Sequence, residues 1–185
     1  MGITGFSHDL LNKYLEPGFT ILELGNQNLY FAPRYGEVAK PYYEGRGHKH
    51  VSIDMNGKDG ALSMNLGDPL ELGERFDIVT DFGTSEHVAG FYGCWKNKHD
   101  HCKLGGLIIS ENPKTGNWKG HGHHYLTEIF YREIAEVMNY NILAIGEHPA
   151  MSNTKDGWNI YCVMRKNEVD FLTKEEFKKL PVYDV

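Results

Sequence analysis

The feature that most constrains the fold is an alternation between short apolar runs and segments with helical periodicity. Seven apolar runs predict strands, at residues 19–24, 50–54, 61–66, 75–82, 105–113, 141–148 and 158–166. Helical patterns lie around them at residues 7–15, 85–102, 127–140 and 173–180, with a broken helical pattern at 33–45. Near-continuous apolar strands that alternate with helices predict a mostly parallel sheet covered on both faces.

The last two apolar runs break this alternation, because residues 149–157 between them show no helical pattern. Two strands joined by a loop can be antiparallel neighbours. We therefore predict an α/β fold with a doubly wound, seven-stranded, mostly parallel Rossmann-like sheet and an antiparallel last strand. The 185 residues, 1–185, are expected to form a single domain.

Charge and composition disfavour several classes of function. A formal net charge of −6 argues against binding of nucleic acid by phosphate neutralisation. No signal peptide is evident, and no apolar run is long enough to cross a bilayer, so no membrane association is expected. The three cysteines form no CxxC pair, which favours reduced thiols and a cytoplasmic location.

Polar side chains follow four predicted strands in succession. Glu23 and Gly25 end the first strand, Asp54 the second, Asn65 the third and Asp81 the fourth. In doubly wound sheets, ligands bind beyond the carboxyl ends of the strands, where the winding reverses. The four strand ends together therefore predict a binding site at this edge of the sheet.

The residue types at this edge suit different parts of a nucleoside-like ligand. Gly25 allows a sharp turn and a close approach of the backbone. Asp54 can accept hydrogen bonds from both hydroxyls of a ribose, and Asn65 can reach an adenine edge. Glu23 could meet a cation, directly or through water. The turn after Gly25 carries amide side chains where a pyrophosphate would need further glycines, so a ligand without phosphates is expected.

These segments resemble the class I S-adenosylmethionine-dependent methyltransferases over residues 19–166. The first motif of that family is similar to "ILELGNQ", the second to "HVSID" and the third to "MNLGDPL". The fourth motif of its small-molecule members is similar to "FDIVTDFGTSEHV", and "CKLGGLIISENP" resembles its fifth strand and the turn before it. The chain departs from the first motif, because Gln27 and Leu29 replace its second and third glycines.

The resemblance implies S-adenosylmethionine as cofactor. The residues that it and the strand ends predict for cofactor binding are Glu23, Gly25, Asn26, Gln27, Asp54, Met55, Asn65, Leu66, Asp81, Phe82 and Gly83.

Candidate catalytic residues follow the fourth and fifth predicted strands. They are Glu86, His87, His121 and His124. Methyl transfer mainly needs alignment and, for some acceptors, removal of a proton, for which histidine is suited near neutral pH. Some family members hold a divalent ion through a carboxylate-x-x-Glu-His motif. Here Gly83 stands at the first carboxylate position, so the ligand set is incomplete and no metal is expected.

The expected function is methyl transfer to a small-molecule or sugar-like acceptor. Asn112-Pro113 follows the fifth strand rather than the fourth, where DNA amino-methyltransferases carry a similar motif, so nucleic-acid methylation is disfavoured. Two alternatives stay open. A nicotinamide-dependent oxidoreductase would keep the fold and Asp54 but needs a glycine-rich turn, and a non-catalytic module would bind the cofactor without turnover.

Overall fold

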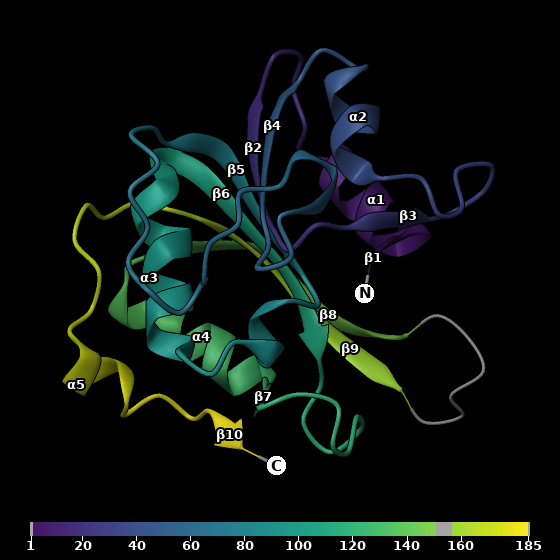
Figure 1. The fold of residues 1–185 in the computed structure, drawn as a ribbon. Coiled ribbons are helices and arrows are strands. Elements are labelled where there is room, and N and C mark those ends of the chain that lie inside the picture. The colour runs from purple at the N-terminus through teal and green to yellow at the C-terminus, as the bar shows by residue number, and fades with distance from the viewer. Residues whose placement is uncertain (1, 151–156, 185) are drawn as a thin grey trace.

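A six-stranded sheet in the order β4-β2-β5-β6-β9-β8 forms the centre of the protein in the computed structural model, which describes residues 2–150 and 157–184 (Figure 1). Its strands are β2 (Thr20–Leu24), β4 (Lys49–Ile53), β5 (Phe76–Phe82), β6 (Cys102–Pro113), β8 (Asn141–Pro149) and β9 (Trp158–Arg165). Strands β4, β2, β5 and β6 run parallel, whereas β9 is antiparallel to both β6 and β8. The predicted mostly parallel sheet with an antiparallel last strand is confirmed.

One of the seven predicted strands, the third, at residues 61–66, is wrong. Leu62 pairs with Ile53 of β4 at a single position, through two hydrogen bonds that Leu62 shares with Ser52 and Asp54. The side chain of Asn65 then accepts a hydrogen bond from the Gly67 amide at 3.0 Å and turns the chain. Local hydrogen bonds of an asparagine side chain compete with strand pairing, so this segment turns away after one bridge.

Helices cover both faces of the sheet, as Figure 1 shows. One face carries α1 (Gly5–Asn12) and α2 (Ala39–Glu44), and the other carries α3 (Phe91–His101), α4 (Glu128–Val137) and α5 (Lys174–Phe177). Side chains alternate along each strand, so Leu22 and Leu24 of β2 pack toward α3 and α4, whereas Ile21 packs toward α1 and α2. Both layers are apolar, which buries the sheet on two sides.

Shorter elements complete the fold and shape the edge of the sheet. They are β1 (Gly2–Thr4) paired in parallel with β3 (Asn28–Tyr30), β7 (His124–Tyr125) paired with β10 (Tyr183–Asp184), and the 3₁₀ turns η1 (Lys58–Gly60) and η2 (Ser85–His87). The β1–β3 pair was not predicted. It means that the turn after β2 continues into an extended segment rather than into a helix.

Helix ends differ from the predictions in two places. The first helix begins at Gly5, with Thr4 as its N-cap, rather than at residue 7, and the helix expected from Ser85 is divided into η2 and α3, with Gly90 at the N-cap of α3. The predicted helix at residues 127–140 begins there as α4, and Thr127 caps it by accepting from the Phe130 amide. Residues 151–156 of the predicted loop lie outside the described residues. Among the residues described, none of the helices could cross a membrane.

Candidate functional site

A cleft of about 580 Å³ lies at the carboxyl ends of β2, β4 and β5, where the winding of the sheet reverses. Eight of the eleven predicted cofactor residues line it: Gly25, Asn26, Gln27, Asp54, Met55, Asn65, Leu66 and Gly83. The cleft is also lined by His87, which was predicted as a catalytic residue, and by Ile53, Met64, Thr84, Val88 and Ala89, which were not predicted as site residues. The volume is in the range of small-molecule sites. We call this the first cleft.

The carboxylate of Asp54 is held in place by the backbone. The amide of Asn26 donates to Oδ2 at 3.0 Å, and the amide of Asn56 donates to Oδ1 at 2.9 Å. A carboxylate can accept about four hydrogen bonds, so lone pairs remain on both oxygens for a ligand. This is a preorganised acceptor suited to neighbouring hydroxyl groups.

The turn at Gly25 is closed by side chains of its own neighbourhood. Gly25 has φ +84°, and a Cβ there would lie 2.5 Å from Nε2 of Gln27 and 2.6 Å from Oγ1 of Thr84. Nε2 of Gln27 donates to the Leu24 carbonyl at 3.2 Å and to Thr84 Oγ1 at 2.9 Å. Only glycine fits at this position, and the amide at the second motif position ties β2 to the end of β5.

The side chain of Asn65 is occupied by local hydrogen bonds. Its Oδ1 accepts from the Gly67 amide at 3.0 Å, and its Nδ2 donates to Asp68 Oδ2 at 2.9 Å. An adenine edge could therefore be contacted by the backbone of Asn65. Contact by its side chain would require these two hydrogen bonds to break.

Three predicted cofactor residues lie away from the wall of the first cleft: Glu23, Asp81 and Phe82. Glu23 points toward the α2 layer because strand side chains alternate, and there it accepts from the Gln27 amide at 3.1 Å. Its Oε1 lies 3.5 Å from Nε2 of the buried His50. Glu23 therefore stabilises the turn after β2 through its hydrogen bond with the Gln27 amide, on the side of the sheet that carries α2.

Asp81 forms a fully buried ion pair with Lys98 of α3. Burial alone would raise the pKa of Asp81, but the Lys98 ammonium and hydrogen bonds from Ser85 outweigh it and hold the pKa below its usual value. The carboxylate also accepts from the Thr84 amide at 3.2 Å and from Asn112 Nδ2 at 3.3 Å. Asp81 thus fixes the start of η2 and the end of β6, beneath the surface of the site.

A second cleft, of about 350 Å³, lies on the other side of Gly83. Its wall includes three aromatic residues, Tyr30, Phe82 and Trp118, together with Glu111 and His121. The sequence did not indicate this cleft, because β1, β3 and the segment around Trp118 come together only through tertiary contacts. Gly83 lines both clefts, so they are neighbours.

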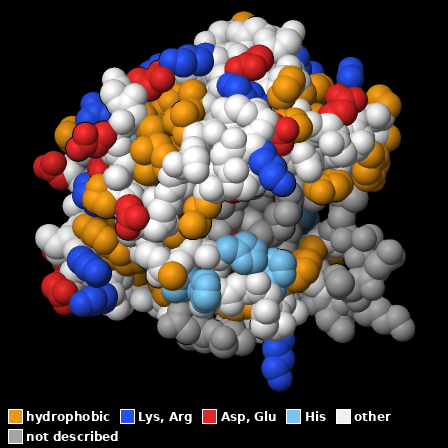
Figure 2. Space-filling model, viewed as in Figure 1, with side chains coloured by type: hydrophobic (Ala, Val, Ile, Leu, Met, Phe, Trp, Pro, Cys, Tyr) orange, Lys and Arg blue, Asp and Glu red, His pale blue; other side chains and the backbone are white. Residues whose placement is uncertain are grey.

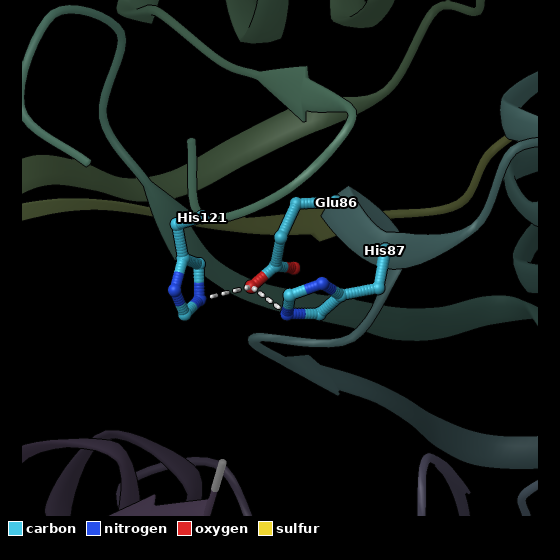
Figure 3. A group of neighbouring side chains, drawn as sticks. All are labelled: Glu86, His87 and His121. Carbon is cyan, nitrogen blue, oxygen red and sulfur yellow. Dashed lines mark ion pairs between the residues drawn. The ribbon is translucent and has the colours of Figure 1, made fainter. Parts of the chain in front are cut away.

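Glu86, His87 and His121 form a cluster between the two clefts (Figure 3). Oε1 of Glu86 lies 3.7 Å from Nε2 of His87 and 3.9 Å from Nε2 of His121. His87 lines the first cleft and His121 the second. Figure 2 shows histidine side chains gathered beside a hollow on the viewed face. The structure therefore brings together three of the four predicted catalytic residues.

The electrostatics of this cluster favour neutral groups. Burial and the nearby Asp81 carboxylate raise the pKa of Glu86 to about 8. Burial lowers the pKa of His87, with a further contribution from His121, and burial also lowers the pKa of His121. Neutral imidazoles can accept a proton or bind a metal ion, and both roles are open to these side chains.

His124, the fourth predicted catalytic residue, lies elsewhere. Its ring centroid is 4.4 Å from that of Phe91, and it lines a separate cleft between α3 and the C-terminal segment. His123 and His124 follow Gly122, the residue that lies against Glu86, whereas His121 precedes it. Sequence proximity to His121 did not place His124 in the same cluster.

The fold is similar to that of several solved structures, although no family model and no curated protein matches the sequence. The N-methyltransferase NodS from Bradyrhizobium japonicum WM9 has 13% identity and a TM-score of 0.59, over 85% of this chain and 90% of that one. The glycopeptide N-methyltransferase MtfA in complex with S-adenosylmethionine has 9% identity and a TM-score of 0.56, over 88% and 93%.

The [4+2]-cyclase SpnF is similar at 11% identity and a TM-score of 0.64, over 86% of this chain and 79% of that one. A fold shared by methyltransferases and a cyclase does not by itself fix the reaction. Together, these neighbours and the order of the strands show that the chain has the fold of the class I S-adenosylmethionine-dependent methyltransferases.

Proposed function

We propose that the protein is an S-adenosylmethionine-dependent methyltransferase that binds its cofactor in the first cleft and a small-molecule acceptor in the second. The observation that carries this proposal is the meeting of Gly25, Asp54 and Gly83 in one cleft, with a second cleft directly beyond Gly83. The fold of the structural neighbours supports the same assignment.

The residues of the first cleft fit an adenosyl group without phosphates. Asp54 offers free lone pairs for ribose hydroxyls, and Gly25 makes the turn that brings the backbone to the wall of the cleft. No phenylalanine, tyrosine or tryptophan is among the described residues that line this cleft, so none of these large rings fills it. The turn offers the Gln27 amide rather than the row of glycines that a pyrophosphate requires.

When bound, the cofactor supplies a methyl group on an activated sulfonium. The task of the chain is then to align donor and acceptor and to prepare the acceptor atom. Three aromatic residues, Tyr30, Phe82 and Trp118, line the second cleft, and such a lining suits an acceptor with a ring, including a sugar. Glu86, His87 and His121 lie between the clefts, and we assign the activation of the acceptor to this cluster.

Calorimetry with S-adenosylhomocysteine tests the proposal. Asp54→Ala should weaken binding by about 10- to 150-fold, because a hydrogen bond to a charged group contributes about 1.5–3 kcal/mol. Asp170→Ala, at an exposed carboxylate outside the cleft, is the matched control and should bind as the wild type does. Absence of binding heat at millimolar ligand, or equal affinity of Asp54→Ala and wild type, would reject the assignment.

The two alternatives predict different outcomes in the same assay. Binding of NADH that is tighter than binding of S-adenosylhomocysteine would favour the oxidoreductase. Clear cofactor binding without transfer to a broad panel of hydroxyl- and amine-bearing small molecules would favour a non-catalytic module.

A further inference from the structure

The cluster of Glu86, His87 and His121 has the composition and spacing of a metal site. Each residue offers one ligand atom, and the three atoms lie within 4.8 Å of one another. Figure 3 shows one carboxylate oxygen pointing between the two imidazole rings. Ligand atoms about 2.0–2.2 Å from a tetrahedral ion lie about 3.2–3.6 Å apart. The distances of 3.7 Å and 3.9 Å from Glu86 Oε1 to the two Nε2 atoms exceed that spacing by a few tenths of an ångström.

One oxygen of Glu86 is buried without a donor. The side chain of Glu86 is 1% exposed, and its Oε1 has no hydrogen-bond partner among the residues that the structure describes. The other oxygen accepts from Asn112 Nδ2 at 3.2 Å, and Asn112 is in turn fixed by the Tyr131 hydroxyl at 2.9 Å. A buried acceptor without a donor is costly. A bound cation would satisfy this oxygen.

His87 and His121 differ from the buried His99 in the hydrogen bonds of their ring nitrogens. Both ring nitrogens of the buried His99 are bonded, to the Tyr140 hydroxyl at 2.6 Å and to the Val169 carbonyl at 2.8 Å. In contrast, Nε2 of His87 and of His121 faces Glu86 at distances too long for a hydrogen bond. Their spacing leaves room for an ion between the three groups.

The segment that carries His121 is anchored against Glu86. The amide of His123 donates to the Glu86 carbonyl at 2.6 Å, and a Cβ on Gly122 would lie 2.8 Å from the same oxygen. The hydroxyl of Tyr125 accepts from the amides of His121 at 2.7 Å and of Gly122 at 3.0 Å. The third ligand is therefore held in place by the backbone rather than by a long flexible side chain.

We propose that Glu86, His87 and His121 bind one divalent transition-metal ion of the zinc or cobalt type. Two imidazoles and one carboxylate favour such ions over magnesium and calcium, which prefer oxygen ligands. Three protein ligands leave a coordination position for water or for an oxygen or nitrogen atom of the acceptor. The metal site stands on its own geometry and does not depend on the cofactor assignment.

The test is titration of metal-stripped protein with cobalt(II), followed by absorption, and with zinc(II), followed by calorimetry, both without cofactor. The wild type should take up one tight equivalent. Glu86→Gln and His121→Gln should each weaken that equivalent at least about 100-fold, because each removes one of only three protein ligands. His123→Gln, two residues from His121 and exposed, is the matched control and should keep wild-type affinity.

Stoichiometry separates this site from the other histidines of the chain, which has ten in all. Absence of a tight equivalent in the wild type, or its retention in both Glu86→Gln and His121→Gln, would overturn the proposal. Thermal unfolding of each metal-free variant shows whether it has folded. Calorimetry with S-adenosylhomocysteine on the same samples should give unchanged affinities, so failure of the metal site and failure of the cofactor site are distinguishable.

Discussion

The first cleft and the Glu86–His87–His121 cluster are built in different ways. In the first cleft, Asp54 and Gln27 are held by hydrogen bonds of 2.9–3.2 Å to the backbone at the ends of adjacent parallel strands. In the cluster, residues from two distant segments face one another, and Oε1 of Glu86 is left without a donor among the described residues. The groups at the sheet edge are therefore held by hydrogen bonds within the chain, whereas Oε1 at the centre of the cluster is open to a bound ion.

The largest expected effect comes from Lys98→Met, which should weaken both regions together. Removal of one partner of a buried ion pair costs about 3–5 kcal/mol, and Asp81 would lose its buried counter-ion. Asp81 holds the amides of Thr84 and Ser85, so affinity for S-adenosylhomocysteine and for metal should both fall. Urea unfolding gives the free energy of unfolding.

The matched double variant, Asp81→Asn with Lys98→Met, should recover part of that loss because no unpaired charge remains. A change in the free energy of unfolding below about 1 kcal/mol for Lys98→Met alone would contradict the role given to the pair.

Gly25→Ala should damage the first cleft alone. An alanine in the left-handed region costs about 1–2 kcal/mol, and the Cβ would also displace Gln27 and Thr84, for a total of about 1–3 kcal/mol. Affinity for S-adenosylhomocysteine should fall at least about tenfold, with metal affinity unchanged. Gly18→Ala is the control, because Gly18 has φ +80° but no atom within 4 Å of its Cβ position.

Equal cofactor affinities for Gly25→Ala and Gly18→Ala would show that contact at Gly25 does not matter for the ligand. Equal losses of stability would show that only the backbone conformation, and not the contact with Gln27 and Thr84, has a cost.

The difference between the two regions also explains what the sequence could predict. Gly25 and Asp54 follow directly from the ends of apolar runs, because parallel strands bring their carboxyl ends together. Glu23 and Asp81 share that position in the sequence, yet they face away from the cleft because side chains alternate along a strand. The expected strand at residues 61–66 failed for a local reason, the turn made by Asn65.

Tertiary contacts decide the second cleft and the cluster. Nothing in the run "HGHHY" distinguishes His121 from His124, and only the contact of Gly122 with Glu86 brings one and not the other to the site. Pairing of β1 with β3, which adds Tyr30 to the second cleft, also joins segments without a periodic signal.

A smaller, pH-dependent effect on stability is expected from His99, which lies outside the Glu86–His87–His121 cluster. Burial lowers the pKa of His99 to about 4 in the folded protein, below the usual value of 6.5. As the pH falls, His99 therefore binds a proton in the unfolded chain before it does so in the folded protein. The stability that is present above about pH 6.5 is lost as the pH falls toward 4. We expect a contribution of about 1–2 kcal/mol, reduced by solvent screening.

Urea unfolding of wild type and His99→Gln between pH 4 and pH 7 measures this contribution, and the variant should show the flatter dependence. Parallel curves for the two proteins would mean that folding does not lower the pKa of His99, in contradiction to its burial.

Gly122→Ala should lower the free energy of unfolding by about 1–2 kcal/mol, because its Cβ would lie too close to a backbone oxygen that cannot rotate away. A Cβ at this position would lie 2.8 Å from the Glu86 carbonyl and 3.0 Å from Glu86 Cγ, so the segment must move by a few tenths of an ångström. That shift weakens the hydrogen bond from the His123 amide to Glu86, which contributes about 0.5–1.5 kcal/mol. Because His121 moves with the segment, metal affinity should fall about tenfold, whereas affinity for S-adenosylhomocysteine should stay at the wild-type value.

Gly5→Ala is the control for this variant, since its Cβ would meet only the Phe31 Cβ at an ordinary 3.8 Å. It should leave both affinities unchanged. A loss of cofactor affinity in Gly122→Ala as large as its loss of metal affinity would show that the two regions respond as one unit. The rigid sheet edge would then owe its shape to the same segment that carries His121, and the contrast between the two regions would no longer hold.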